Sequence, residues 1–489
     1  MKISISIKEN ALFRLREYVS GFSAEKFILI LAVALAVLAT AYFYSRDLLV
    51  AYGDAESHLN IAKRVIDSLT PGFAQLGGVW LPLPHIFLIP FVYFDFLWRT
   101  GLAGSIVSGI LFIISSLFIY KLSFLLTQNK AGSIFAALVF MLNLNILYMQ
   151  STPMTEIPLI AFFILSSYYF VKFVKDQNDI FSLLLAAFFS FAAALTRYDG
   201  WFLVFMETGI IVLMYFPWQS VPRKFKDIKE KFDTERWKKL EGNAILFAIF
   251  GLFGISLWLM WDFLILGDPL YFSTSQFSAK SQQSGWLARG ELPAYRNIWL
   301  SFLYYLVTSM SNLGVIIFLL AIAGVWLFLS EKENKKRFYI MLLLLVPFTF
   351  NVLTLYLGQS VIFIPHITPT TFEWTLFNVR YGIMMVPLAA IAVGYLFFRR
   401  KLAGRLLIVF LFLFQFALYG VGYSKIISLE DGARGLSSAI LKIPDAQNFI
   451  SEHYDGGLVL ADDFARTISI IRSPIPMKNI IYVGNRPYW

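Results

Sequence analysis

The chain has no cysteine and few charged residues, and both shortages narrow the class of protein. Without cysteine it can form no disulfide, no thiolate metal site and no cysteine nucleophile. Charged residues make up only 15% of its 489 residues, against about 25% in soluble domains. Hydrophobic residues make up 58% and gather in runs long enough to cross a bilayer. We therefore predict an all-α polytopic membrane protein and exclude soluble, disordered and fibrous classes.

Eleven apolar runs, each of about 17–25 residues, predict eleven transmembrane helices. They lie near 27–45, 102–125, 131–150, 157–174, 180–196, 200–217, 243–266, 313–330, 338–357, 381–398 and 405–424. The first run begins near Phe27 and continues to anchor length, so we expect no cleavable signal peptide. A further run, 83–98, is short and contains Pro84, Pro90 and Asp95. Whether it crosses decides the sidedness of every later loop.

The distribution of Lys and Arg indicates that 83–98 does not cross. In that case the inner segments carry 25 of these residues, eight of them in the loop 218–242, and the outer loops before residue 425 carry 9. Cytoplasmic loops are the ones enriched in Lys and Arg. We therefore predict helices on the outer surface at 83–98 and 300–310, and a solvated cytoplasmic helix at 218–242. The localisation is then a multi-pass plasma-membrane protein with its N-terminus cytoplasmic and its C-terminus extracytoplasmic.

Three regions follow from this topology. They are a cytoplasmic segment 1–26, a transmembrane domain 27–424 with a first extracytoplasmic loop 46–101, and an extracytoplasmic tail 425–489. The tail contains Gly456-Gly457 and two short β-type runs, 458–460 and 480–483, so we expect a small α/β unit. Its abrupt end at Trp489 is what a truncated chain would show.

The acids of the outer loops are candidates for chemistry. The first loop opens with Asp54, Glu56 and His58, and an amphipathic helix lying on the membrane surface is expected from Leu59 onward. Glu156 follows a second outer loop, at the same membrane level as Asp54. Two such acids could share a proton-transfer or metal-binding task. The alternatives are solvated loop acids, a helix N-cap at Asp54, and a His58 that binds no metal.

Two arginines lie on the same outer side. Arg197 joins two predicted spans, and Arg380 opens another beside Tyr381. A guanidinium group can bind a lipid phosphate through two hydrogen bonds. The alternative for either arginine is that it anchors the helix at the membrane interface. For Arg197, a local ion pair with Asp199 is a second alternative.

Together these residues resemble the GT-C superfamily of membrane glycosyltransferases, in the branch of the protein O-mannosyltransferases and the lipid A aminoarabinose transferase. The resemblance covers roughly 27–217, with weaker similarity at 262–272 and 378–390. It is carried by Asp54 and Glu56 and by the segments 80–85 (WLPLPH), 152–158 (TPMTEIP) and 195–200 (LTRYDG). The Asp-Ala-Glu sequence at 54–56 departs from the adjacent acidic pair of the O-mannosyltransferases. The Trp-Trp-Asp signature of oligosaccharyltransferases is absent, so N-linked glycan transfer is not expected.

The resemblance implies inverting transfer of a hexose or pentose from a polyprenyl-phosphate donor to a protein, lipid or glycan acceptor on the outer face. Asp54 would be the general base, assisted by Glu156, with Glu56 as a further catalytic candidate. Substrate contacts would come from the following residues: Arg380, Arg197, Tyr381, His85 and Trp80.

Two questions stay open in the sequence. One is whether the chain binds a divalent cation (Mg, Mn or Ca), for which Asp54, Glu156 and His58 are the candidate ligands. The other is whether the chain is instead a transporter or flippase of lipid-linked sugars. Such a protein would show matching broken spans and ionisable residues at mid-membrane. Here the acids lie mainly at span ends and no inverted repeat is evident, so glycosyl transfer is favoured. No nucleic acid partner is expected.

Overall fold

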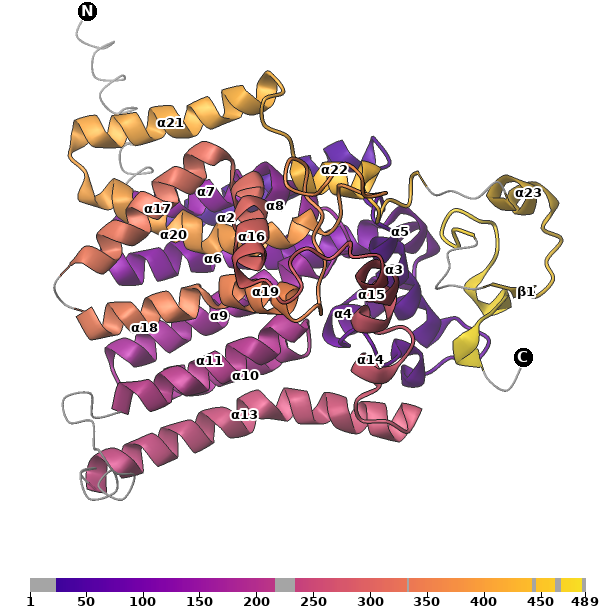
Figure 1. Cartoon of the computed structure of the whole chain (residues 1–489), viewed down its shortest axis with the longest axis horizontal. Helices are drawn as coiled ribbons and strands as arrows, with labels where there is room; N and C mark the ends of the chain where they lie inside the picture. The colour runs from indigo at the N-terminus through magenta and orange to yellow at the C-terminus, as the bar shows by residue number, and fades with distance from the viewer. Residues whose placement is uncertain (1–22, 216–233, 332–333, 442–445, 462–467, 486–489) are drawn as a thin grey trace, which may run out of the picture.

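The computed structural model describes residues 23–215, 234–331, 334–441, 446–461 and 468–485. In this part of the chain the long helices lie roughly parallel and form one bundle (Figure 1). The predicted helix 218–242 falls largely outside the described residues, and its last residues belong to helix α13, which begins at Thr234. The predicted all-α membrane architecture is confirmed.

Seven helices of the described residues are long and apolar enough to cross a bilayer. They are α2 (Ala24–Tyr44), α6 (Leu102–Thr127), α9 (Glu156–Lys175), α11 (Tyr198–Tyr215), α13 (Thr234–Leu266), the joined pair η2 (Val379–Met385) and α20 (Val386–Arg399), and α21 (Leu402–Gly420). Each coincides with a predicted apolar run, because length and hydropathy alone determine where a chain can span.

Two further predicted spans, 313–330 and 338–357, belong to bent helix pairs; the bend lies at the start of the first span and inside the second. Helices α16 (Ile298–Leu313) and α17 (Val315–Ser330) meet at 112°, and α18 (Asn334–Leu344) and α19 (Val346–Tyr356) meet at 51°. Gly314, at the first bend, has a φ of 80°, which a residue with a side chain rarely adopts. The predicted 300–310 helix is α16, which runs across the bundle (Figure 1).

The remaining predicted spans are shorter helices, α7 (Lys130–Met141) and α10 (Ile180–Ala194). The run 131–150 was expected to be one helix, and this is wrong: it breaks after α7 and resumes as α8 (Leu144–Met149). Asn143 causes the break, because its side chain accepts a hydrogen bond from the amide of Ile146 and so begins a new helix. The count of eleven spans stays a prediction.

The first loop is more structured than the sequence indicates. Helix α3 (Gly53–Ile66) begins before the acids instead of after them, and η1 (Phe73–Leu76) follows. The run 83–98 forms two helices, α4 (Leu83–Val92) and α5 (Asp95–Thr100), because Phe94 is extended. The polar face of α3 is covered: Lys63 is buried and its Nζ lies 2.7 Å from the Asp95 carboxylate. This helix therefore packs against protein on its polar side.

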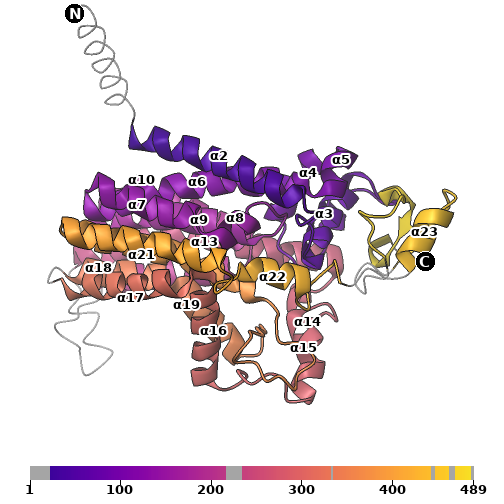
Figure 2. The same cartoon turned by 90° about the horizontal axis from the view of Figure 1, so that it is seen from above.

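One end of the bundle carries the helices that matter below. In Figures 1 and 2, α3, α4, α5 and the tail lie at the end opposite the first residues of α2. Helices α14 (Tyr271–Thr274), α15 (Ala279–Ala288) and α22 (Ile427–Arg434) lie at this end as well. In the tail, β1 (Val459–Leu460) pairs in parallel with β2 (Ile480–Ile481), beside α23 (Ala446–His453), η3 (Met477–Asn479) and η4 (Val483–Asn485). Both strands fall in the runs predicted to be β-type.

Candidate functional site

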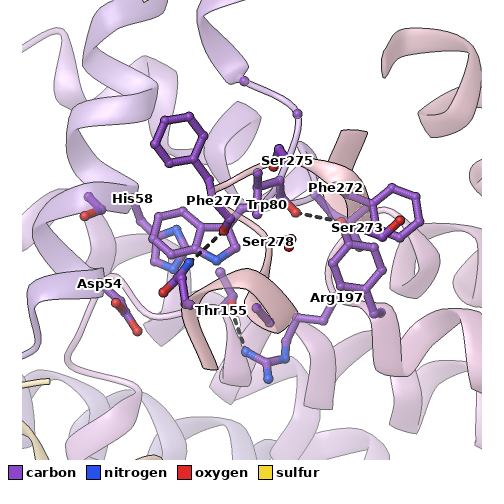
Figure 3. Close-up of a pocket in the computed structure, with 18 of the residues that line it drawn as sticks. Asp54, His58, Trp80, Thr155, Arg197, Phe272, Ser273, Ser275, Phe277 and Ser278 are labelled. Atoms are coloured by element: carbon purple, nitrogen blue, oxygen red, sulfur yellow. Dashed lines mark hydrogen bonds between the residues drawn. The ribbon is translucent and has the colours of Figure 1, made fainter. Parts of the chain in front are cut away.

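Asp54 lies in the first turn of α3, at the end of the bundle described above. An acid in the first turn is favoured by the helix dipole. Its Oδ2 accepts a hydrogen bond of 2.7 Å from Arg380 Nη2. The side chain keeps 23% of its surface exposed and lines a large cavity (Figure 3). Asp54 can therefore meet a ligand while it is held by an arginine.

Glu156 is the first residue of α9 and is fully buried. Burying a carboxylate is costly unless cations and hydrogen bonds surround it. Its Oε1 accepts hydrogen bonds of 3.1 Å from Arg197 Nη1 and 3.1 Å from Arg380 Nε. One carboxylate oxygen thus binds both predicted arginines.

The turn before Glu156 is fixed by α6. Ser105 and Ser108 donate to the carbonyl oxygens of Ser151 and Thr152, at 2.6 and 3.0 Å. Gly104 lets the helix approach Pro153 so closely that an added Cβ would lie 2.2 Å from the proline Cα. The small and hydroxylated residues of α6 therefore determine where α9 begins.

Arg380 is the centre of the cluster. It lies in η2, just after Asn378, whose φ of 55° places it in the left-handed region. Its guanidinium group joins Asp54 to Glu156 and lies against two aromatic rings, 4.8 Å from the centre of Tyr52 and 5.2 Å from that of Tyr381. The planar guanidinium group suits both the stacking and the two directed hydrogen bonds.

Arg197 completes the cluster from the other side. Besides Glu156 it donates to Thr155 Oγ1 at 3.0 Å (Figure 3), and its Nε lies 3.7 Å from Asp199 Oδ2. The local ion pair with Asp199 is therefore present together with the contact to Glu156. The ring of Tyr381 lies 5.1 Å from the Arg197 guanidinium carbon, so both arginines contact this tyrosine.

A pair of histidines lies next to Asp54. His58, one helical turn further on, shares a hydrogen bond of 2.9 Å with His85, and its ring centre lies 4.5 Å from that of Trp80. Both histidines are buried, and burial lowers the pKa of His58 to about 4. His58 and Trp80 line the cavity, whereas His85 lies behind His58 and is hydrogen-bonded to it.

Glu56 does not join the cluster. Its carboxylate accepts hydrogen bonds from Ser469 Oγ at 2.9 Å and from the Ile471 amide at 3.3 Å, both in the tail. The physical reason is helical geometry: the side chains of residues i and i+2 of a helix point in directions about 200° apart. Because α3 already includes both acids, Glu56 must point away from Asp54.

Two members of the cluster were not predicted from the sequence. Tyr52 is buried beneath Arg380, and Asp431 of α22 lies with its Oδ2 3.9 Å from Arg380 Nη1. Asp431 is in a short polar helix after the last predicted span, where nothing nearby in the sequence indicates burial. Only long-range packing reveals it.

A cavity of about 1830 Å³ opens above these residues. One wall comes from α3 and the segment 74–81, and the facing wall comes from α14 and α15 with the segment that joins them (Figure 3). Arg197 and Arg380 are at its lining too, as are Tyr482, Val483 and Gly484 of the tail. The cavity thus brings the charged cluster together with both loops and the tail.

The predicted metal ligands do not form a metal cluster. No group of three or more His, Asp or Glu suited to a metal occurs among the residues that the structure describes. Asp54 and Glu156 are joined by Arg380, and His58 binds His85 through Nδ1. Each predicted ligand is therefore already bound to another side chain, with Asp54 and Glu156 sharing Arg380.

The family model of the dolichyl-phosphate-mannose-protein mannosyltransferases matches residues 93–232. This segment includes Glu156, Arg197 and Asp199, whereas Asp54 and Arg380 lie outside it. The match confirms the resemblance to the GT-C superfamily that the motifs predict. No curated protein matches the chain.

Solved structures also resemble the chain. The crystal structure of an Archaeoglobus fulgidus oligosaccharyltransferase in complex with Zn and sulfate has a TM-score of 0.47 and 12% identity, over 92% of this chain and 58% of that one. The archaeal oligosaccharyltransferase AglB of the same organism, in complex with an inhibitory peptide and a dolichol-phosphate, gives a TM-score of 0.47 and 12% identity over 88% and 58%. The chain thus spans a little over half the length of these proteins.

Proposed function

We propose that this chain is a GT-C-type membrane glycosyltransferase that moves a sugar from a polyprenyl-phosphate donor to an acceptor hydroxyl on the extracytoplasmic side. The observation that carries the proposal is the contact of Arg380 with both Asp54 and Glu156 at the cavity. A base and a phosphate-binding cation are then neighbours, as transfer from a lipid phosphate requires.

The lining of the cavity supports a lipid donor. Phe205 of α11 and Ile265 of α13 belong to the lining, and they are 57% and 41% exposed on helices long enough to span a bilayer. Exposed apolar surface on such helices faces lipid. A polyprenyl tail could therefore lie between these helices while its phosphate reaches the arginines.

The arginines would bind the donor phosphate by exchange of partners. In the structure the acids occupy Arg380 Nε and Nη2 and Arg197 Nη1. A phosphate oxygen accepts the same donors, so its binding would weaken the hold of Arg380 on Asp54. Asp54 becomes more basic as this ion pair loosens, which couples donor binding to activation of the base.

The chemical step is a single displacement at the anomeric carbon. The acceptor oxygen forms a bond to that carbon while its proton passes to the Asp54 carboxylate. The bond between the anomeric carbon and the phosphate oxygen breaks, and polyprenyl phosphate leaves with the electron pair. Arg380 and Arg197 stabilise the negative charge that develops on the phosphate, and attack from the opposite side inverts the configuration.

The test is turnover of the purified protein with polyprenyl-phosphate sugars, measured as release of polyprenyl phosphate. Asp54→Asn keeps the shape of the side chain but cannot take the proton, so we expect at least a hundredfold loss of turnover with an unchanged unfolding temperature. The control is Asp47→Asn in the same loop, an exposed residue whose Oδ2 lies 3.8 Å from Arg472 Nη2.

Near-wild-type turnover of Asp54→Asn would refute the base assignment. Movement of intact lipid-linked sugar across vesicles, without release of the lipid phosphate, would instead support the transporter alternative. Turnover before and after treatment with a chelator decides whether a divalent cation takes part. The sugar, whether hexose or pentose, is identified by which donor in the panel is consumed.

A further inference from the structure

A buried acid at the cluster has no role in the mechanism above. Asp431 of α22 is fully buried, and its Oδ2 lies 3.3 Å from the Tyr52 hydroxyl oxygen. Its Oδ1 accepts no hydrogen bond of ordinary geometry in the described ranges, although the backbone amide of Val379 is near enough to the carboxylate to favour its ionised form. Burying a carboxylate in this way is costly unless a cation compensates for it.

The nearest cation is the third nitrogen of Arg380. Arg380 Nη1 lies 3.9 Å from Asp431 Oδ2 and, within the part of the chain that the structure describes, forms no hydrogen bond of its own. The guanidinium group therefore faces three acids, each through a different nitrogen: Glu156 through Nε, Asp54 through Nη2 and Asp431 through Nη1. Only the first two approach within hydrogen-bond distance.

The segment that carries Asp431 also holds the start of α3. The Gly53 amide donates to Ser437 O and the Ala439 amide donates to Ala51 O, both at 2.8 Å. The Tyr52 hydroxyl donates to Ser428 O at 2.5 Å. The residues on both sides of Asp431 therefore fix the backbone from which Asp54 projects.

We propose that Asp431 is a positioning residue that holds the Arg380 guanidinium group between Asp54 and Glu156. This inference rests on the proposed function. Asp431 is buried and does not line the cavity, so it acts through Arg380 and not on substrate. The attraction between the Asp431 carboxylate and Nη1 orients the planar guanidinium group so that Nε and Nη2 reach Glu156 and Asp54.

The ionisation of Asp431 gives the inference a pH signature. The groups around it are Arg380 of η2, Tyr52 and Asp54 from the start of α3, and Tyr148 of α8. Burial raises the pKa of Asp431 to about 6, although Arg380 opposes the increase. As the pH falls through this value the acid takes up a proton and its attraction for Nη1 is lost.

The experiment compares Asp431→Asn with the wild-type chain, using release of polyprenyl phosphate from a polyprenyl-phosphate sugar between pH 5 and 8. For Asp431→Asn we expect a kcat tenfold to hundredfold lower at pH 7.5 and a KM for the donor within threefold of wild type. The decrease in kcat that the wild-type chain should show as the pH falls through about 6, the acid limb of its pH profile, should be lost. Asp431→Glu should restore part of the rate and the limb. Glu430→Gln is the matched control, because Glu430 is the neighbouring acid and pairs with Arg434 at the surface.

A second readout does not depend on turnover. A cryo-EM structure of Asp431→Asn should show Arg380 Nη2 more than 3.5 Å from the Asp54 carboxylate. If the wild-type chain releases no lipid phosphate, the proposed function fails, and this distance still decides the role of Asp431. Wild-type rates and pH profile in Asp431→Asn, or an unmoved Arg380, would overturn the inference. If Asp431→Asn does not fold, Asp431→Ser, which also removes the carboxylate, is judged by the same two measurements.

Discussion

At the residue scale, the cluster depends on the shape of a guanidinium group as well as on its charge. Arg380 contacts two acids through Nε and Nη2, at 3.1 and 2.7 Å, and lies against the rings of Tyr52 and Tyr381. A lysine ammonium group at the same place would keep the charge but would lose the planar fork and the stacking.

Arg380→Lys is therefore expected to reduce donor turnover about a hundredfold or more, the usual effect of removing a fixed donor from a developing charge. The measurement is release of polyprenyl phosphate, with thermal unfolding measured in parallel. Arg289→Lys is the control, since Arg289 forms an exposed pair with Glu291 at 2.7 Å. A rate within threefold of wild type would show that charge alone is sufficient.

Some members of the site could be predicted from sequence because they interrupt apolar runs. Glu156, Arg197 and Arg380 border predicted spans, where a polar residue is conspicuous, and Asp54 lies in the acidic start of the first outer loop. Asp431 could not be found in this way, because its neighbours in sequence are polar. Glu56 was expected at the same site, but the true start of α3 turns it toward the tail.

At the scale of elements, the turn before Glu156 depends on close packing. Two serines of α6 bond to its carbonyl groups, and Gly104 provides the space for Pro153. An added methyl group would have to displace the proline backbone, because the Cβ would lie only 2.2 Å from it. Such a shift would carry Glu156 with it.

Gly104→Ala is therefore expected to lower turnover tenfold to a hundredfold, since a displacement of about 1 Å can have that effect on a reacting site. Gly109→Ala, on the same helix, is the matched control: the nearest atom to its added Cβ is 3.4 Å away. Equal rates of turnover for the two variants would show that the α6 contact does not position Glu156.

The elements themselves could be predicted to different degrees. Long apolar runs determine the straight spans, whereas the breaks depend on single residues. Asn143 begins α8, and Gly314 permits the 112° bend between α16 and α17. The bend at Gly314 falls at the predicted boundary between the 300–310 helix and the 313–330 span. The break at Asn143 lies inside a run predicted as one helix, because one polar residue does not end an apolar run.

At the scale of the whole molecule, helices α3 and α22, which carry Asp54 and Asp431, lie at the same end of the bundle (Figures 1 and 2). Which end faces the cell exterior stays a prediction from the distribution of Lys and Arg. The absence of cysteine makes this directly measurable, because any introduced thiol is the only one present.

Ser284→Cys, on exposed α15, is expected to react with a membrane-impermeant maleimide added to intact cells. Arg400→Cys, exposed at the other end of α20, is expected to react only after the membrane is permeabilised. Labelling is measured by the mass increase of the purified chain. The opposite pattern would reverse the orientation and place the cavity on the cytoplasmic side.

The shared oxygen of Glu156 has an evolutionary consequence. Because Oε1 binds Arg197 and Arg380 together, losing Glu156 removes a partner from both arginines, and losing either arginine leaves the buried carboxylate with a single cation. Substitutions here are therefore non-additive, and a lineage could leave this arrangement only by changing several codons almost at once. Among homologues, the three positions should covary as a block, with intermediate combinations rare.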